Sequence, residues 1–191
     1  MGAQEPTRAA SPIFTTEGLT AELRQSEIIS DLVQYEVNPD TSEAPNVTHD
    51  YCIIVMQDCD LYWDFAKRSS GEAATLNGVL VYEAETIDQF RPKIPKGTDI
   101  WKRIRQNTDE RYHVLEAIPA EQDLLGKGIP ELAIDFKRLF SMPPTEIERQ
   151  CARRDQAKRR CRLLEPYREH LQTRAAFYLQ RVMLPLSHNV R

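Results

Sequence analysis

The stretch Tyr51-Cys52-Ile53-Ile54-Val55-Met56-Gln57-Asp58-Cys59-Asp60 joins a continuous apolar run to a short polar triplet. The run from Cys52 to Gln57 has the length of a strand, and its lack of polar alternation predicts a central strand buried on both faces. The triplet Asp58-Cys59-Asp60 follows at once, so the strand would hold three reactive side chains at one edge of a core. Rigid elements that end near solvent commonly carry functional side chains.

Further strand patterns lie on both sides of this run. Period-2 or β-branched segments predict strands over residues 27–37, 76–82, 113–118 and 133–142, short helices are expected over 84–90 and 100–106, and 38–50 is expected to be a loop. Because the strands are short and βαβ alternation is scarce, residues 21–144 are predicted to form a β-rich body, either a strongly bent sheet or a small barrel. The fold class expected for the whole chain is α+β.

The two ends of the chain differ from this body. Residues 1–20 are rich in small and polar residues and are expected to be a disordered arm. Residues 145–191 are expected to be helical, because Thr145 to Glu148 reads as a capping box after two prolines. The first helix would reach about Leu164, and a second would follow Pro166 and run to about Leu184.

Charge divides the chain unevenly. The net charge of the 191 residues is −4, yet residues 145–191 carry eleven Lys or Arg against five Asp or Glu, and residues 1–144 carry fourteen against twenty-four. This asymmetry favours either an arm for an anionic partner or a basic segment that packs on its own acidic body. No apolar run is long enough to span a bilayer and no signal peptide pattern is present, so we expect a cytoplasmic protein without membrane contact and with four free thiols.

Asp58, Cys59 and Asp60 are the leading candidates for a site, and Gln57 would share the face of Cys59 on a regular strand. Carboxylates with a thiolate could bind zinc or another divalent metal, with His113 or His49 as an added ligand. A nucleophilic Cys59 is disfavoured, because acidic neighbours raise the pKa of a thiol. The structural alternative has Asp58 or Asp60 cap backbone N–H groups while Cys59 packs inward, and the sequence leans towards it.

Two other groups could line a binding site. Trp63, with Tyr62 and Phe65, could stack a base or line a pocket, although such aromatic residues more often close a core. Arg111 and His113 stand before and within a predicted strand, where His113 could act as an acid or base or simply pack.

The basic segment offers a candidate nucleic-acid surface. Its members are Arg149, Arg153, Arg154, Lys158, Arg159, Arg160 and Arg162. Binding to a phosphate backbone would be independent of base sequence and sensitive to salt. The alternative is a solvated helix face, or one paired with the acidic body.

Four stretches resemble a group of small bacterial proteins that carry a Gln-x-Cys-Asp-Leu motif at the end of an apolar strand. They are residues 57–61, 23–28, 134–140 and the segment 162–171 with 181–185. The group usually has Gly where this chain has Ser26 and Met183, so two turns lose backbone freedom here. The resemblance implies an SH3-like barrel, loosely akin to the PemK/MazF toxin barrel, and it implies no particular activity.

Two functions are compatible with these patterns. The first is a non-catalytic interaction module of a bacterial system that needs no cofactor and binds a protein or nucleic acid through its basic C-terminal segment. The second is a metal-dependent nuclease or hydrolase that uses Asp58, Cys59 and Asp60, or a metal-independent ribonuclease of the toxin type that uses Arg111 and His113. The sequence leans towards the first and leaves the enzyme question open.

Overall fold

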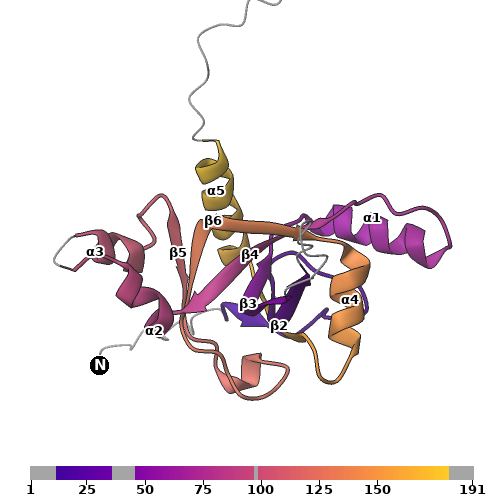
Figure 1. The fold of residues 1–191 in the computed structure, drawn as a ribbon, viewed down its shortest axis with the longest axis horizontal. Coiled ribbons are helices and arrows are strands. Elements are labelled where there is room, and N and C mark those ends of the chain that lie inside the picture. Colours follow the sequence, from indigo (N-terminus) through magenta and orange to yellow (C-terminus); the bar gives the residue numbers. More distant parts are fainter. Residues whose placement is uncertain (1–11, 36–45, 97–98, 181–191) are drawn as a thin grey trace, which may run out of the picture.

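The computed structural model describes residues 12–35, 46–96 and 99–180 (Figure 1). Seven strands and five α-helices follow one another in these ranges, together with two short 3-10 helices at Arg91–Lys93 and Ala120–Gln122. The strands are β1 (Phe14–Thr15), β2 (Glu27–Tyr35), β3 (Asn46–Ile54), β4 (Val79–Thr86), β5 (Tyr112–Leu115), β6 (Leu132–Met142) and β7 (Lys158–Leu163). The α-helices are α1 (Asp58–Ser69), α2 (Ile87–Phe90), α3 (Ile100–Arg105), α4 (Pro144–Ala152) and α5 (Tyr167–Leu179).

The strands form one antiparallel sheet in the order β1-β7-β2-β3-β4-β6-β5. The predicted α+β class is confirmed. The sheet has β1 and β5 at its two edges, so it is not closed into a barrel. Register shifts between Ile28 and Ile29 and between Tyr82 and Ala84 interrupt the ladders, and such bulges bend and twist a sheet locally.

Three apolar clusters hold the helices on this sheet. Helix α5 contributes Leu171 and Ala175 to the first cluster, which contains Ile28, Ile53 and Phe136 from the sheet. The second cluster joins Leu61 of α1 and Ile147 of α4 to a set of strand residues, Ile29, Leu32, Cys52, Ile54 and Val81. The third lies at the end of the molecule where Figure 1 shows α2 and α3, and it includes Phe90 and Ile104.

The apolar run that opened the sequence analysis is a central strand, but it is placed earlier in the chain than predicted. Strand β3 begins at Asn46, inside the expected loop, and ends at Ile54. Cys52, Ile53 and Ile54 are fully buried, as expected of a strand covered on both faces. The following residues lead into α1, so Asp58, Cys59 and Asp60 occupy the first turn of a helix instead of the end of a strand.

The C-terminal segment differs most from the prediction. The helix expected from Thr145 to about Leu164 ends at Ala152, and residues 158–163 form β7 between β1 and β2. The expected capping box does not form, because the N-cap is Pro143 and makes no side-chain cap bond. The second expected helix is present as α5. Pairing with two strands has therefore overridden the local helical pattern.

The N-terminal prediction is also changed in part. Phe14 and Thr15 form β1 and pair with Leu163 and Arg162 of β7, so the ordered body begins before residue 21. Residues 1–11 lie outside the described part of the chain. Within the described ranges, no helix is both long enough and apolar enough to cross a membrane.

Candidate functional site

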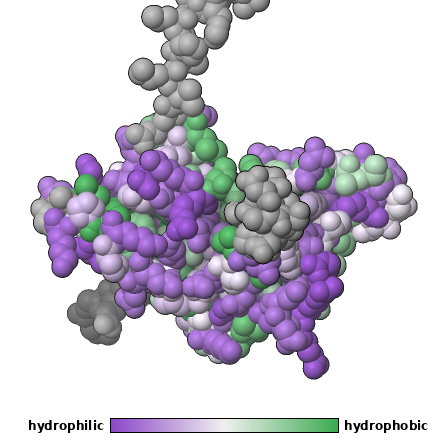
Figure 2. Space-filling view, viewed as in Figure 1, coloured by the Kyte–Doolittle hydropathy of each residue, from purple (hydrophilic) through white to green (hydrophobic). Residues whose placement is uncertain are grey.

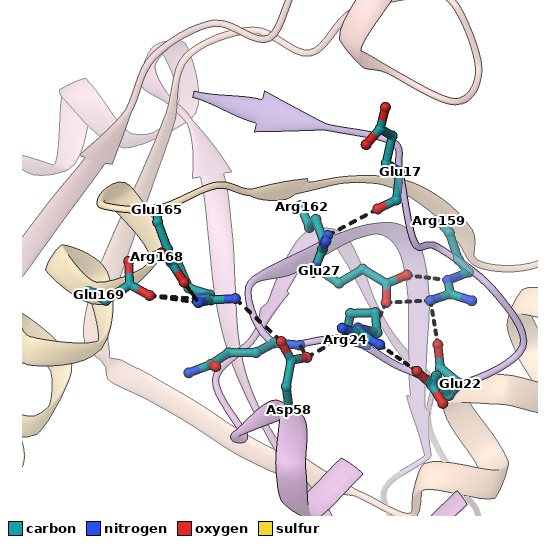
Figure 3. Close-up of polar contacts among 11 residues, drawn as sticks. Glu17, Glu22, Arg24, Glu27, Asp58, Arg159, Arg162, Glu165, Arg168 and Glu169 are labelled. Carbon is teal, nitrogen blue, oxygen red and sulfur yellow. Dashed lines mark hydrogen bonds and ion pairs between the residues drawn. The ribbon is translucent and has the colours of Figure 1, made fainter. Parts of the chain in front are cut away.

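Asp58 connects three separate parts of the fold (Figure 3). Its Oδ1 accepts a hydrogen bond from the backbone N–H of Gln25 at 2.7 Å and lies 3.3 Å from Nε of Arg24. Its Oδ2 lies 3.4 Å from Nη1 of Arg168 on α5. Asp58 therefore fits the structural alternative, because it caps a backbone N–H group and joins α1 to the segment before β2 and to α5.

Cys59 and Asp60 point away from this junction, and both are exposed. The expectation that Cys59 packs inward is wrong. A helix turns about 100° per residue, so only one member of three consecutive residues faces the body. The Sγ atom of Cys59 lies 3.6 Å from Oε1 of Gln57, but the regular strand that was expected to place them on one face is absent, because Gln57 is the N-cap of α1 and Cys59 lies in its first turn.

The histidines proposed as additional metal ligands are buried at other places. His49 stacks on Phe140 with 4.4 Å between ring centroids, and its Nε2 lies 3.1 Å from Oε1 of Gln34. His113 packs near Phe136 and His170. In residues 12–35, 46–96 and 99–180 no three His, Cys, Asp or Glu side chains converge as metal ligands.

The aromatic residues after the triplet are surface residues. Tyr62 is 52% exposed and Trp63 is 62% exposed, and their rings meet edge to face with centroids 5.7 Å apart. The prediction that they close the core is wrong for both, because Leu61 and Asp64 are the α1 residues that turn inward. Phe65 is half-buried, with the guanidinium of Arg68 5.7 Å from its ring centroid.

A buried carboxylate that the sequence analysis did not single out fixes the far end of α1. Asp64 accepts hydrogen bonds from the backbone N–H groups of Thr75 and Leu76 at 2.8 and 2.9 Å and from Nε of Arg68 at 2.6 Å. Arg68 also binds both carboxylate oxygens of Glu148 on α4. Burial raises the pKa of Asp64, but the N–H of Leu76, Arg68 and the N–H of Thr75 outweigh it and leave that pKa lowered. The i, i+4 spacing of Asp64 and Arg68 was the only signal of this anchor in the sequence.

Five of the seven members of the basic segment bind other groups of the protein itself. Arg159 forms a bidentate pair with the fully buried Glu27, and Arg160 forms another with Asp123 through two bonds of 2.7 Å. Nε of Arg162 donates to the carbonyl oxygen of Glu17 at 3.1 Å (Figure 3), and Nζ of Lys158 donates to two carbonyl oxygens of the α4–β7 turn. Arg149 binds Glu146. Arg153 and Arg154 are exposed.

Arg111 and His113 do not form an acid–base pair. Arg111 binds the carboxylate of Asp135, with Nε 2.7 Å from Oδ1, and its guanidinium lies over the ring of Tyr112. His113 is buried, and burial, together with the nearby Arg174 and His170, lowers its pKa to about 3. A neutral, enclosed imidazole fits the packing alternative.

Comparison of the chain with protein-family models, with curated proteins and with solved structures gives no significant match. At Ser26, where the resemblance given in the sequence analysis implies a glycine, the backbone adopts the left-handed conformation that Gly favours, with φ of 58°. Met183, the second such position, lies outside the described residues.

We predict that Asp58→Ala lowers the free energy of unfolding by about 1–3 kcal/mol, because it removes a charged acceptor from three partners. Asp60→Ala is the matched control: it removes an equivalent carboxylate from the same helix turn, and its effect is expected to stay within about 0.5 kcal/mol. Urea unfolding of both variants measures the difference. Equal losses would mean that the charge at the helix N-terminus matters and that the junction at Asp58 does not.

The lowered pKa of His113 predicts a pH-dependent stability. Between the unfolded pKa near 6.5 and the folded pKa of about 3, the unfolded state binds the additional proton, so stability falls as the pH falls through this window. Relative to His113→Gln, the wild-type chain is expected to lose about 2 kcal/mol more on going from pH 7 to pH 5. Urea unfolding at these two pH values tests this, and parallel losses in the two proteins would contradict a buried neutral His113.

Proposed function

We propose that the protein is a non-catalytic interaction module that binds a partner protein through the exposed side of α1. This surface, called the α1 contact face, consists of Cys59, Tyr62 and Trp63. The three positions follow the i, i+3, i+4 spacing that brings side chains together on one side of a helix. The observation that carries the proposal is the outward position of two adjacent aromatic side chains that core packing does not use.

The chemistry of these residues suits protein binding. Tyrosine and tryptophan are enriched at the energetic centres of protein interfaces, where each contributes a large apolar area and a hydrogen-bond donor. Tyr62 and Trp63 already contact each other edge to face, so part of their side-chain freedom is lost before any partner binds.

The opposite side of α1 supports the same proposal. Leu61 is buried in the second core cluster, Asp64 holds the following loop, and Arg68 holds α4 through Glu148. Figure 1 shows α1 extending from the body at the end opposite α2 and α3, where a partner has room to approach. A contact face on an anchored helix is preorganised and loses little entropy on binding.

The basic C-terminal segment is a weaker basis for the partner. Its two most internal arginines, Arg159 and Arg160, already use their donors on Glu27 and Asp123. Among the seven basic residues at positions 149–162, which the structure describes, Arg153 and Arg154 at the turn between α4 and β7 are exposed and could contact phosphate. Substitution of Arg159 or Arg160 would disturb the fold, so it would not report on nucleic-acid binding. No contact described above favours the hydrolase alternative, and assignment to a bacterial system rests on the sequence resemblance.

The test is site-specific photocrosslinking in the cells that produce the protein. A photoreactive amino acid at position 63 is expected to give a discrete protein adduct, because this position would lie inside the interface. The same amino acid at Asp88, an exposed residue on α2 at the far end of the molecule, is the matched control and is expected to give none.

A second variant checks the role of the aromatic pair. Tyr62→Ala, combined with the photoreactive amino acid at position 63, is expected to reduce the adduct several-fold without lowering stability, because Tyr62 is half exposed. Absence of an adduct at position 63, or an identical pattern at position 88, would contradict the proposal. An adduct that disappears on nuclease treatment would replace the protein partner by nucleic acid.

A further inference from the structure

Arg174 on α5 differs from the paired arginines of this protein. Its Nη2 donates to the backbone carbonyl oxygens of Asp109 and Tyr112, the latter at 2.8 Å, and its Nη1 is buried without a hydrogen-bond partner. Carboxylate partners raise the pKa of Arg105, Arg111 and Arg160. Burial lowers the pKa of Arg174 instead, and the nearby charge of Asp109 offsets this lowering only in part. The guanidinium is therefore a partly desolvated positive charge, and its Nη1 has donor capacity left over.

This side chain lines a cavity of about 270 Å³ between α5 and the segment that precedes β5. The same cavity is lined by the hydroxyl-bearing Thr108 and Thr173, by His170 and by Phe177, whose side chain is 57% exposed. Figure 2 shows apolar residues along α5 where it rises from a mostly hydrophilic surface. The cavity is thus lined by a cationic side chain, two hydroxyl groups and an exposed aromatic ring.

We propose that this cavity binds a carboxylate attached to an apolar or aromatic group. The carboxylate would accept hydrogen bonds from Arg174 and a threonine hydroxyl, and the apolar group would pack on Phe177. The partly buried guanidinium of Arg174 has no hydrogen-bonded carboxylate, and its Nη1 still has donors to spare, so a ligand carboxylate would supply the missing anionic partner. The ligand can be a free carboxylic acid or the C-terminal end of a peptide, because both present the same chemistry.

The other charges around the cavity limit the ligand to a single negative charge. Asp109 and Glu110 also line it, and the carboxylate of Asp109 lies 3.7 Å from Nη2 of Arg103. Burial, reinforced by Arg174, lowers the pKa of His170, so this imidazole adds no positive charge near neutral pH. A dianionic phosphate would be repelled by these two carboxylates, and the single charge of Arg174 could not neutralise both of its negative charges. A monoanion carries one negative charge, which Arg174 can neutralise.

The site is separate from the α1 contact face, so the two proposals can fail independently. The test is an NMR titration of the full chain with phenylacetate, and with phenylacetamide as its uncharged twin. Phenylacetate is expected to shift the amide signals of Thr173 and Arg174 saturably, with a dissociation constant in the millimolar range, and phenylacetamide to bind about tenfold more weakly. A peptide that ends in a free Phe carboxylate, compared with its C-terminal amide, distinguishes a chain end from a free acid.

Variants separate binding from folding. Arg174→Gln is expected to abolish the preference for the charged ligand, whereas Arg168→Gln, the same change on the same helix outside the cavity, is expected to keep it. Arg174 also donates a hydrogen bond from α5 to the carbonyl oxygen of Tyr112, so its substitution could disturb the fold. Phe177→Ser is a second variant that keeps this hydrogen bond. It is expected to weaken phenylacetate binding several-fold. Equal binding of the acid and the amide, or no saturable shift at millimolar concentrations, would overturn the proposal.

Discussion

The pairing of Arg159 with Glu27 constrains the rest of the structure. Glu27 begins β2 and is fully buried, and its carboxylate binds the guanidinium of Arg159 from β7 and the backbone N–H of Arg24. Arg159 also donates to the carbonyl oxygens of Thr20 and Glu22, so one side chain holds β7, β2 and the segment before β2 (Figure 3). Removing one partner of such a buried pair costs about 3–5 kcal/mol, because the other charge is left unpaired.

The position of β7 determines where the neighbouring helices lie. Helix α4 precedes this strand, and its Glu148 binds Arg68 of α1. Helix α5 follows the strand, and its Arg168 contacts Asp58 at the start of α1. The contact face on α1 therefore depends on the C-terminal segment twice, once at each end of the helix. Part of the positive charge of this segment neutralises carboxylates of the acidic body. Arg160 does so with Asp123, as Arg159 does with Glu27.

Local sequence patterns predicted those helices and strands that can be recognised without knowing which distant residues they contact. Alternation identified β2 and β6, and apolar spacing identified α3 and α5. Strand β7 could not be recognised in the same way, because Lys158–Leu163 is mostly cationic and its carboxylate partners lie more than thirty residues away. A charged strand is stable only when distant residues neutralise it, and no local window contains that information.

The candidate site shows the same limit. The sequence singled out the Gln57–Asp60 segment and allowed a capping role for Asp58 or Asp60. Asp58 has that role in the structure, but its partners Gln25 and Arg168 could not be inferred from its neighbours. The sequence favours a core position for Tyr62 and Trp63 over a binding role, because large aromatic side chains are usually buried. Contacts of Leu61, Asp64 and Arg68 with the body determine which side of α1 faces inward. Tyr62 and Trp63 lie on the other side of the helix and are therefore exposed.

Residues 158–163 are an integral strand of the sheet and do not form a free basic arm. Native-state hydrogen exchange tests this most directly, because amides in the stable centre of a sheet exchange only through global unfolding. We expect the amide of Leu163, which donates to the carbonyl oxygen of Ser26, to exchange within about tenfold of the rate of β2 amides, and the exposed turn at residues 153–155 to exchange much faster. Exchange of residues 158–163 at the rate of that turn would show that they do not belong to the stable sheet.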